Sequence, residues 1–350
     1  MVKRFGICSA FLCIFLGCYC DLSASRGNLS NRHRRVSINQ NEQQKVSEKR
    51  NSILRRMSNL AIDIVTPASG VLSDFYLNNK KDFAKFGIKV PSEALINKQI
   101  HFFADTDENR LSRLVRAIDN PKSDIIWTMR GGFGSYKLIS SLKNMPKPAK
   151  SKFFIGYSDI TALNLFISQN WEKYTVIHAP VFREISPNEF YFENWSLLLG
   201  ILEGKIKNYQ ISGLRPFNSA SIRCTTDKIK GRLTGGNLSM IESSLGTCWE
   251  IQTQGKILFI EDYGESGPSL YRSLYHLKET GKLDGTVAII FGRFSRCAAS
   301  AENLKAFADE LDIPVFITDK FGHGGYNTPI VYNASGVIEK NTLQIDLSEL

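Results

Sequence analysis

The stretch from Phe153 to Leu163, with the sequence FFIGYSDITAL, constrains the fold of this chain most strongly. A short apolar run, typical of a buried strand, stops at Gly156, presents Ser158 and continues into a segment whose apolar density suits a packed helix. A serine between the carboxyl end of a strand and a helix N-terminus is well placed to be a nucleophile beside an oxyanion site. The spacing is not G-x-S-x-G, so a serine that only caps the next helix is the alternative interpretation.

Strands and helices alternate on both sides of this stretch. Strands are expected at residues 61–65, 87–90, 124–129, 153–155, 175–181, 256–262, 287–291 and 314–318, with helices between most of them and hairpin strands at the end of the chain. A pattern resembling a capping box, Asp105 to Glu108, opens the helix that we expect to end at Asn120-Pro121. This alternation predicts an α/β fold with a mainly parallel sheet.

The segment from Phe182 to about Ser221 is mixed and aromatic, and we interpret it as the crossover between two domains. The expected division is an N-terminal α/β domain at residues 58–215 and a smaller mixed α/β domain at residues 216–350. No internal repeat is visible in the sequence.

The first 20 residues have the pattern of a secretory signal peptide. Lys3 and Arg4 precede an almost wholly apolar or small stretch from Phe5 to Cys20, which is short for a membrane-spanning helix. Leu16-Gly17-Cys18 weakly resembles a lipoprotein cleavage site, so anchoring through an acylated Cys18 is an alternative to simple cleavage. We therefore expect an exported protein, periplasmic or in the cell envelope.

Residues 21–57 are polar and basic, which predicts a linker or a loosely helical arm. They carry much of the excess behind the net charge of +10. Because this charge lies outside the expected domains, we interpret it as a solvated tail and expect no nucleic acid partner. Peripheral contact with an anionic membrane surface or a cell-wall polymer is the alternative.

Three cysteines follow the apolar N-terminal stretch: Cys224, Cys248 and Cys297. Their odd number and the lack of C-x-x-C spacing argue against a metal cluster or a disulfide scaffold, although one incidental disulfide stays open. We expect neither a metal nor a cofactor.

A second turn, Arg130 to Gly134 with the sequence RGGFG, also follows an expected strand and precedes a helix. Glycines there let backbone N–H groups approach an anion closely. Neither G-x-G-x-x-G nor the Walker spacing is present, so the turn fits an oxyanion-donor site beside Ser158 better than a nucleotide site. Glycines that merely permit a tight turn are the alternative.

A serine nucleophile needs a base, and histidine is the usual one because its pKa lies near neutrality. Of the five histidines, His323 alone lies in a glycine-flanked loop directly after a strand and its short extension. The others are less favourably placed: His33 in the basic arm, His101 at the start of a short strand, His178 among apolar neighbours in a strand, and His276 off the apolar face of its helix.

The base in turn needs a carboxylate to orient it. Glu261 ends the apolar strand that begins at residue 256, so its side chain is expected at the carboxyl edge of the sheet. Asp262 and Glu265 are close rivals, with Asp262 expected on the opposite face of the strand. A pair of solvated acids at the strand end is the alternative.

Five ordered motifs of this sequence resemble those of the LD-carboxypeptidases, the muramoyltetrapeptide carboxypeptidase family of serine peptidases, which includes the microcin C immunity peptidases. The motifs are RGGFG at 130–134, FIGYSDITAL at 154–163, GGNL at 235–238, FIED at 259–262 and FGHG at 321–324. The likeness extends over about residues 60 to 345.

The resemblance implies a catalytic triad of Ser158, His323 and Glu261. It also implies oxyanion donation by the backbone N–H groups of Asp159 and of Gly132, with Gly131 as the close alternative to Gly132. On the same basis we expect two substrate-binding side chains, Arg130 and Asn237. The family fold implies a nucleophile in the N-terminal domain, Glu and His in the C-terminal domain, and an active site in the cleft between them. It also implies a homodimer and no metal.

The function implied is removal of the terminal D-alanine from peptidoglycan tetrapeptides, with a peptidoglycan peptide as the substrate. Two alternatives stay open: a microcin C immunity-like peptidase that acts on peptidyl or aminoacyl nucleotides, and a non-catalytic cell-wall binding protein. Many relatives are cytoplasmic, so an exported member would trim peptidoglycan in place.

Overall fold

The structure, a computed structural model, describes residues 40–350 except 91–94, 97–101, 187–189 and 225–227. The expected signal peptide, the first part of the basic arm, His33 and His101 lie outside the described residues. Residues 41–350 form one unit. Within the described ranges, no helix is both long and apolar enough to cross a membrane.

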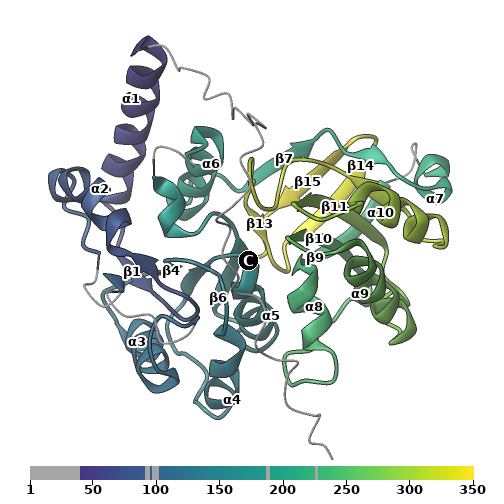
Figure 1. The fold of residues 1–350 in the computed structure, drawn as a ribbon, viewed down its shortest axis with the longest axis horizontal. Coiled ribbons are helices and arrows are strands. Elements are labelled where there is room, and N and C mark those ends of the chain that lie inside the picture. The colour runs from purple at the N-terminus through teal and green to yellow at the C-terminus, as the bar shows by residue number, and fades with distance from the viewer. Residues whose placement is uncertain (1–39, 91–94, 97–101, 187–189, 225–227) are drawn as a thin grey trace, which may run out of the picture. The chain divides into compact units, whose positions relative to one another are not determined.

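The first sheet has five strands in the order β1-β4-β5-β6-β13 (Figure 1). Its first four strands are parallel, and β13 is antiparallel to β6. The strands are β1 (Ile62–Val65), β4 (Ile125–Thr128), β5 (Lys152–Ile155), β6 (Tyr174–His178) and β13 (Ile330–Val331). Every residue of β4 is buried, as expected for a parallel strand that is covered on both faces.

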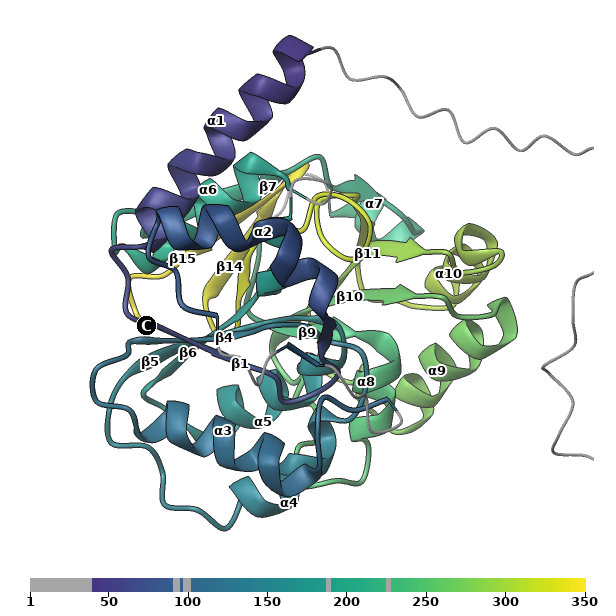
Figure 2. The same ribbon diagram turned by 60° about the vertical axis from the view of Figure 1, so that its left-hand side comes forward.

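Helices cover both faces of this sheet. The α-helices of this part are α1 (Gln40–Met57), α2 (Ser73–Lys85), α3 (Asp107–Asp119), α4 (Ile139–Leu142), α5 (Thr161–Asn170) and α6 (Phe192–Leu202). Figure 2 shows α3, α4 and α5 on one side of the sheet and α1 and α2 on the other. Shorter elements are β2 (Val71–Leu72), paired with β3 (Leu95–Ile96), and the 3₁₀ turns η2 (Ser135–Leu138), η3 (Ser158–Ile160) and η4 (Phe182–Ile185).

The second sheet has eight strands in the order β7-β15-β14-β9-β10-β11-β12-β8. Its centre, β9 to β12, is parallel, whereas β14, β15, β7 and β8 pair antiparallel to their neighbours. The strands are β7 (Asn208–Ser212), β8 (Arg215–Pro216), β9 (Lys228–Asn237), β10 (Lys256–Tyr263), β11 (Ala288–Ser295), β12 (Val315–Ile317), β14 (Ser335–Glu339) and β15 (Thr342–Asp346). Its helices are α7 (Ser219–Arg223), α8 (Leu238–Ser244), α9 (Gly267–Glu279) and α10 (Ser300–Asp309).

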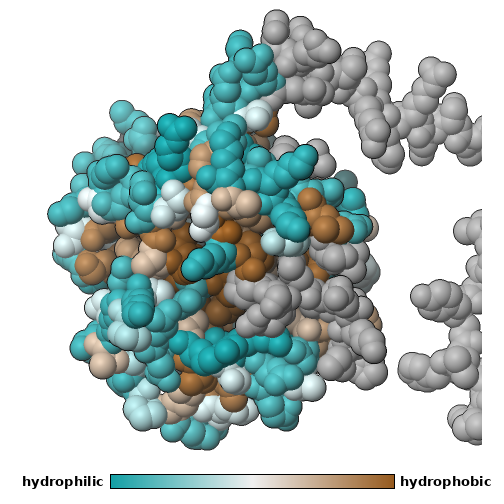
Figure 3. Space-filling model, turned by 90° about the vertical axis from the view of Figure 1, so that its left-hand side faces the viewer, coloured by the Kyte–Doolittle hydropathy of each residue, from teal (hydrophilic) through white to brown (hydrophobic). Residues whose placement is uncertain are grey.

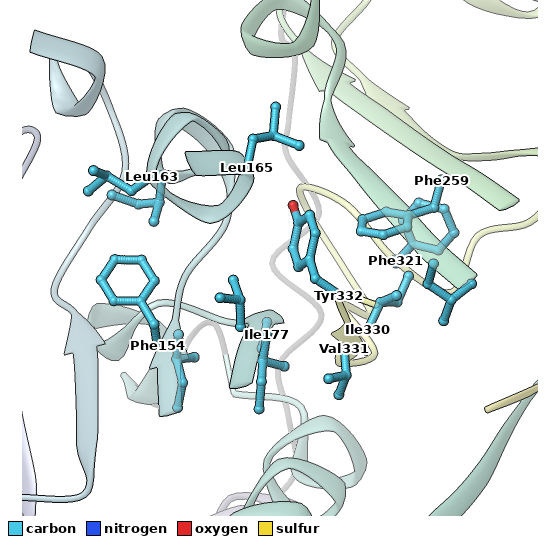
Figure 4. Close-up of a cluster of buried hydrophobic side chains, with 14 of the residues drawn as sticks. Phe154, Leu163, Leu165, Ile177, Phe259, Phe321, Ile330, Val331 and Tyr332 are labelled. Atoms are coloured by element: carbon cyan, nitrogen blue, oxygen red, sulfur yellow. The ribbon is translucent and has the colours of Figure 1, made fainter. Parts of the chain in front are cut away.

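The two sheets share a continuous buried core. Figure 4 shows Phe154 and Ile177 of the first sheet on one side of Ile330, Val331 and Tyr332. Phe259 of the second sheet and Phe321 lie on the other side (Figure 4). Since β13 lies late in the chain but pairs with β6, the C-terminal part contributes a strand to the N-terminal sheet.

The α/β fold class and most of the expected elements are confirmed, with two local differences. Residues 87–90 form no strand. The N-cap of α3 is Thr106, whose hydroxyl accepts a hydrogen bond from the backbone N–H of Asn109, rather than Asp105. The division at residue 215 stays a prediction, and β7, which precedes it, already belongs to the second sheet.

Of the two interpretations of residues 21–57, a linker or a loosely helical arm, the linker is wrong for the second half, because residues 40–57 form the regular helix α1. The side chains of Ile53, Leu54 and Met57 are buried in the core. Arg50 is also buried and donates hydrogen bonds to Asn79 and Asp82 of α2 and to the carbonyl oxygen of Ile185. Figure 3 shows mostly hydrophilic side chains along the rest of α1. The helix is therefore anchored to the core by its C-terminal half.

Candidate active site

Ser158 stands where β5 turns into η3 and α5. Its backbone has a φ of 65°, which is a left-handed conformation that a side chain adopts only at a cost. The turn needs Gly156, because a Cβ atom there would lie 2.4 Å from Oγ1 of Thr128 on the adjacent strand. The half-buried serine side chain is thus held at the carboxyl edge of the first sheet by a strained turn.

Three side chains from distant parts of the chain form one hydrogen-bonded series. Nε2 of His323 lies 3.0 Å from Oγ of Ser158, and Nδ1 of His323 lies 2.6 Å from Oε2 of Glu261. Glu261 is fully buried at the end of β10, and the His323 side chain is 15% exposed. A serine, a base and an orienting carboxylate in this order can activate a hydroxyl group for attack on a carbonyl.

The electrostatics of the pair suit a base. Burial opposes a charge on His323, but the Glu261 carboxylate outweighs it and raises the pKa of His323 above its usual value. Burial likewise works against ionisation of Glu261, and the positive charge of His323 nevertheless holds the pKa of Glu261 below its usual value. Glu261 therefore stays ionised and favours the imidazolium that forms when His323 takes a proton.

The glycine turn after β4 touches the serine. A Cβ atom on Gly131 would lie 2.9 Å from Cβ of Ser158, so only a glycine permits this approach. The next residue, Gly132, is exposed and has a φ of 103°. Among the described residues its backbone N–H donates to no partner, so that group is available as a hydrogen-bond donor, and its part in an oxyanion site stays a prediction.

Two buried charged residues hold this turn in place. The Asp159 carboxylate accepts hydrogen bonds from the backbone N–H groups of Gly134 and Ser135, at 3.0 and 2.8 Å. Arg110 of α3 is fully buried and donates to the carbonyl oxygens of Gly134 and Pro67. The side chain of Asp159 therefore has a structural task of its own, one that we did not expect from the sequence.

The two expected substrate-binding side chains have partners within the protein. Asn237 is buried, caps α8 by accepting from the backbone N–H of Met240, and donates to Asp262 at 2.8 Å. Arg130 donates to the carbonyl oxygen of Gly70 at 2.9 Å. Substrate contact by either residue stays a prediction.

Asp262 is the rejected rival of Glu261, and the structure shows why the two differ. Its carboxylate turns away from His323 and accepts hydrogen bonds from Asn237 and from both the N–H and the hydroxyl group of Ser239. Burial, together with the neighbouring Glu261 charge, raises the pKa of Asp262 to about 6. Glu265, the second rival, accepts hydrogen bonds from the hydroxyl groups of Ser269 and Ser239.

Aromatic rings that we did not single out from the sequence flank His323. The centroids of Tyr157 and Tyr263 lie 4.7 and 5.0 Å from that of the imidazole. The Tyr157 hydroxyl donates to Glu184, which contributes to the raised pKa of His323. Tyr157 directly precedes Ser158 in the GYSD motif, and this position could have identified it as a site residue from the sequence.

Within the described ranges, no group of three or more His, Cys, Asp or Glu side chains is arranged to hold a metal ion. The thiols of Cys224, Cys248 and Cys297 are free in this structure.

A two-sheet α/β fold with serine, histidine and glutamate in hydrogen-bonded order defines a class of hydrolytic enzymes. Family models described as the LD-carboxypeptidase N-terminal domain and the LD-carboxypeptidase C-terminal domain match residues 62–179 and 230–338. The chain belongs to the LD-carboxypeptidase family.

Individual relatives cover most of the chain. A putative carboxypeptidase of Rickettsia conorii is 41% identical over 286 residues, which are 81% of this chain and 90% of the relative. A murein tetrapeptide carboxypeptidase of Pseudomonas aeruginosa is 26% identical over 302 residues, 81% of this chain and 94% of that protein.

Solved structures share the fold. The muramoyltetrapeptide carboxypeptidase from Oxalobacter formigenes superposes with a TM-score of 0.65 at 22% identity, over 81% of this chain and 98% of that one. The microcin C7 self-immunity protein MccF, in complex with glutamyl sulfamoyl guanosine, superposes with a TM-score of 0.67 at 20% identity, over 81% of this chain and 95% of that one.

Proposed function

We propose that this protein is a serine-type LD-carboxypeptidase that releases the terminal D-alanine from peptidoglycan tetrapeptides. The observation that carries the proposal is the series from Ser158 through His323 to Glu261, with distances of 3.0 and 2.6 Å. Membership in the LD-carboxypeptidase family and the likeness to a murein tetrapeptide carboxypeptidase support the substrate class.

In this mechanism His323 takes the proton of the Ser158 hydroxyl as Oγ attacks the carbonyl carbon of the last amide bond. The backbone N–H groups of Gly132 and Asp159 stabilise the negative oxygen of the tetrahedral intermediate. His323 then gives the proton to the nitrogen of the departing D-alanine, and an acyl-enzyme remains on Ser158. Water, deprotonated by the same imidazole, hydrolyses the acyl-enzyme and releases the tripeptide.

The direct test is incubation of the pure protein with a muropeptide tetrapeptide, followed by mass spectrometry. We expect a tripeptide and free D-alanine in equal amounts. A tetrapeptide that stays intact at high enzyme concentration, while a known family member cleaves it under the same conditions, would refute the proposed substrate.

The likeness to MccF makes an aminoacyl or peptidyl nucleotide the second substrate class to test. A non-hydrolysed aminoacyl sulfamoyl nucleoside serves as the probe in a binding measurement, alongside the tetrapeptide. Tight binding of the nucleoside probe together with no cleavage of the tetrapeptide would favour this alternative.

We further propose that the enzyme acts outside the cytoplasm, on peptidoglycan in place, as a homodimer. The support for export is the sequence pattern of the first 20 residues, with Lys3 and Arg4 before an apolar stretch. Detection of a mature N-terminus in the secreted fraction tests the compartment. Sedimentation of that mature form tests its oligomeric state. A full-length N-terminus found only in the cytoplasm would contradict export.

A further inference from the structure

His178 lies at the seam between the two sheets and takes no part in the mechanism above. It is the last residue of β6 and pairs in register with Ile330 of β13. Its ring is fully buried, with centroids 5.5 Å from Tyr157 and 5.4 Å from Phe259. Figure 4 shows the surroundings of this seam, where Phe259 and Phe321 face Ile330.

Four buried polar atoms near this seam make no hydrogen bond of good geometry among the described residues, although Asn327 lies near the ring of His178 and Asn237 near the carboxylate of Glu261. They are both ring nitrogens of His178, Oε1 of Glu261 and Nδ2 of Asn327. An isolated polar group in a protein interior is costly, so native proteins pair almost all such atoms. Four of them gathered on residues next to the active site call for a shared explanation.

The donor and acceptor types of these atoms match one another. An ionised carboxylate only accepts hydrogen bonds, an amide nitrogen only donates them, and a neutral imidazole does one of each. Oδ1 of Asn327 accepts from the backbone N–H of Gly322 at 3.1 Å, which leaves Nδ2 as the free end of the amide. Burial lowers the pKa of His178 to about 4, so its ring is neutral where the enzyme works.

We propose that His178 is a positioning residue of the reaction, whose neutral ring accepts a hydrogen bond from Nδ2 of Asn327 and donates one to Oε1 of Glu261, directly or through one water molecule. This inference rests on the proposed function, because it assigns a support to the Glu261 of that mechanism. Oε2 of Glu261 holds His323 while Oε1 is held from the other sheet, so the carboxylate is fixed at both oxygens.

The consequence is a physical link between the halves of the active site. Ser158 and His178 belong to the first sheet and its turns, whereas Glu261 belongs to the second. A hydrogen bond from His178 to Glu261 would tie the two sheets together directly behind the catalytic base. It would also fix the tautomer of His178, because only one ring nitrogen can face the carboxylate.

The test compares His178→Phe with a matched variant of the same strand, Tyr174→Phe, which also removes a buried polar atom without a partner. If the ring of His178 only fills space in the core, phenylalanine fills that space at least as well, and activity is unchanged. If it holds Glu261, the variant leaves a charged oxygen without its donor, and we expect kcat to fall about 10- to 100-fold with little change in KM. Tyr174→Phe should keep wild-type kcat.

The pH profile gives a second readout that packing alone would not change. A Glu261 carboxylate with one donor fewer attracts the proton of His323 more strongly, so the acidic limb of kcat/KM should move to higher pH in His178→Phe. A folded His178→Phe enzyme with the wild-type kcat and pH profile would overturn the proposal.

A measurement on the unmutated enzyme covers the case in which His178→Phe fails to fold. In ¹⁵N-histidine NMR spectra we expect His178 to be neutral, with one slowly exchanging ring N–H whose resonance shifts in Glu261→Gln. A doubly protonated ring at neutral pH, or a resonance that ignores Glu261→Gln, would overturn the proposal. An inactive wild-type enzyme would refute the proposed function instead, so the two failures are distinguishable.

Discussion

Nε2 of His323 lies 3.0 Å from Oγ of Ser158, although 165 residues separate them in the chain. The serine belongs to a turn of the first sheet, and the histidine to the loop between β12 of the second sheet and β13 of the first. The reactive pair therefore exists only when the two sheets are packed together. Activity should therefore be lost whenever the packing between the two sheets, drawn in Figure 4, is lost.

Ser158→Ala should abolish the reaction while leaving the fold intact. The variant removes the nucleophile, and a loss of roughly 10⁴- to 10⁶-fold in kcat is expected for such a change. Ser140→Ala on α4 removes an exposed hydroxyl that donates only to the carbonyl oxygen of Lys137 in the adjoining turn η2, and it should behave as wild type. Residual activity of Ser158→Ala within tenfold of wild type would exclude a serine mechanism.

The pH dependence should report the pairing of His323 with Glu261. His323 acts as a base only when neutral, so kcat/KM should fall as pH decreases through its pKa, which the Glu261 carboxylate raises despite burial. In Glu261→Gln the raising charge is gone and burial remains, so the acidic limb should move to lower pH. The rate itself should drop by about 10⁴-fold because the imidazole loses its orientation. If the acidic limb of Glu261→Gln stays at the wild-type position, Glu261 does not raise the pKa of the catalytic base.

Gly132→Ala tests the oxyanion turn. A Cβ atom there would lie 2.4 Å from Oγ of Ser69, and the φ of 103° disfavours any side chain. Displacement of the Gly132 N–H should lower kcat by about 10²- to 10³-fold with a small effect on KM. Gly204→Ala is the control, since it has a φ of 68° and open space, and it shares only the backbone strain. If the two variants lose equal activity, the cause is backbone strain and not displacement of the Gly132 N–H.

Local patterns allowed much of this molecule to be predicted from its sequence. Apolar runs and the points where they break predicted three elements of the site. These are the strand ending at Ile155, the glycine turn at residues 130–134 and the strand ending near Glu261. The contact between Glu261 and His323 was expected, and the hydrogen bond at 2.6 Å is present. A motif order shared with a family supplied what spacing alone does not, namely which distant residues meet.

What the sequence did not reveal depends on packing between distant elements. The tasks of Arg110 and of the Asp159 carboxylate follow from the position of the glycine turn, which is a tertiary fact. His178 looked like an ordinary strand residue because its neighbours in sequence are apolar, whereas in the fold the charge of Glu261 acts on its ring. The end of the basic arm was expected to be a linker or loosely helical, rather than a helix packed on the core, because its polar residues outnumber the few that are buried.

Arg50→Ala tests whether α1 belongs to the folded core rather than to the arm. The guanidinium is buried and donates to Asn79 at 2.6 Å and to the carbonyl oxygen of Ile185 at 2.7 Å, besides its ion pair with Asp82. Truncation leaves three acceptors with fewer donors, and Asp82 is partly exposed, so we expect a loss of about 2 kcal/mol in the free energy of unfolding. Urea denaturation measures the difference.

The matched control is Arg55→Ala, which removes an exposed arginine from the same helix and should change the free energy of unfolding by less than about 0.5 kcal/mol. If both variants unfold like the wild type, α1 contributes nothing to the core, and the folded part begins only at the first strand. If only Arg50→Ala is destabilised, the helix fixes the position of Ile185, next to the Glu184 that bonds Tyr157 beside His323. The N-terminal segment then bears on the environment of the catalytic base, and Arg50→Ala should also lower kcat modestly.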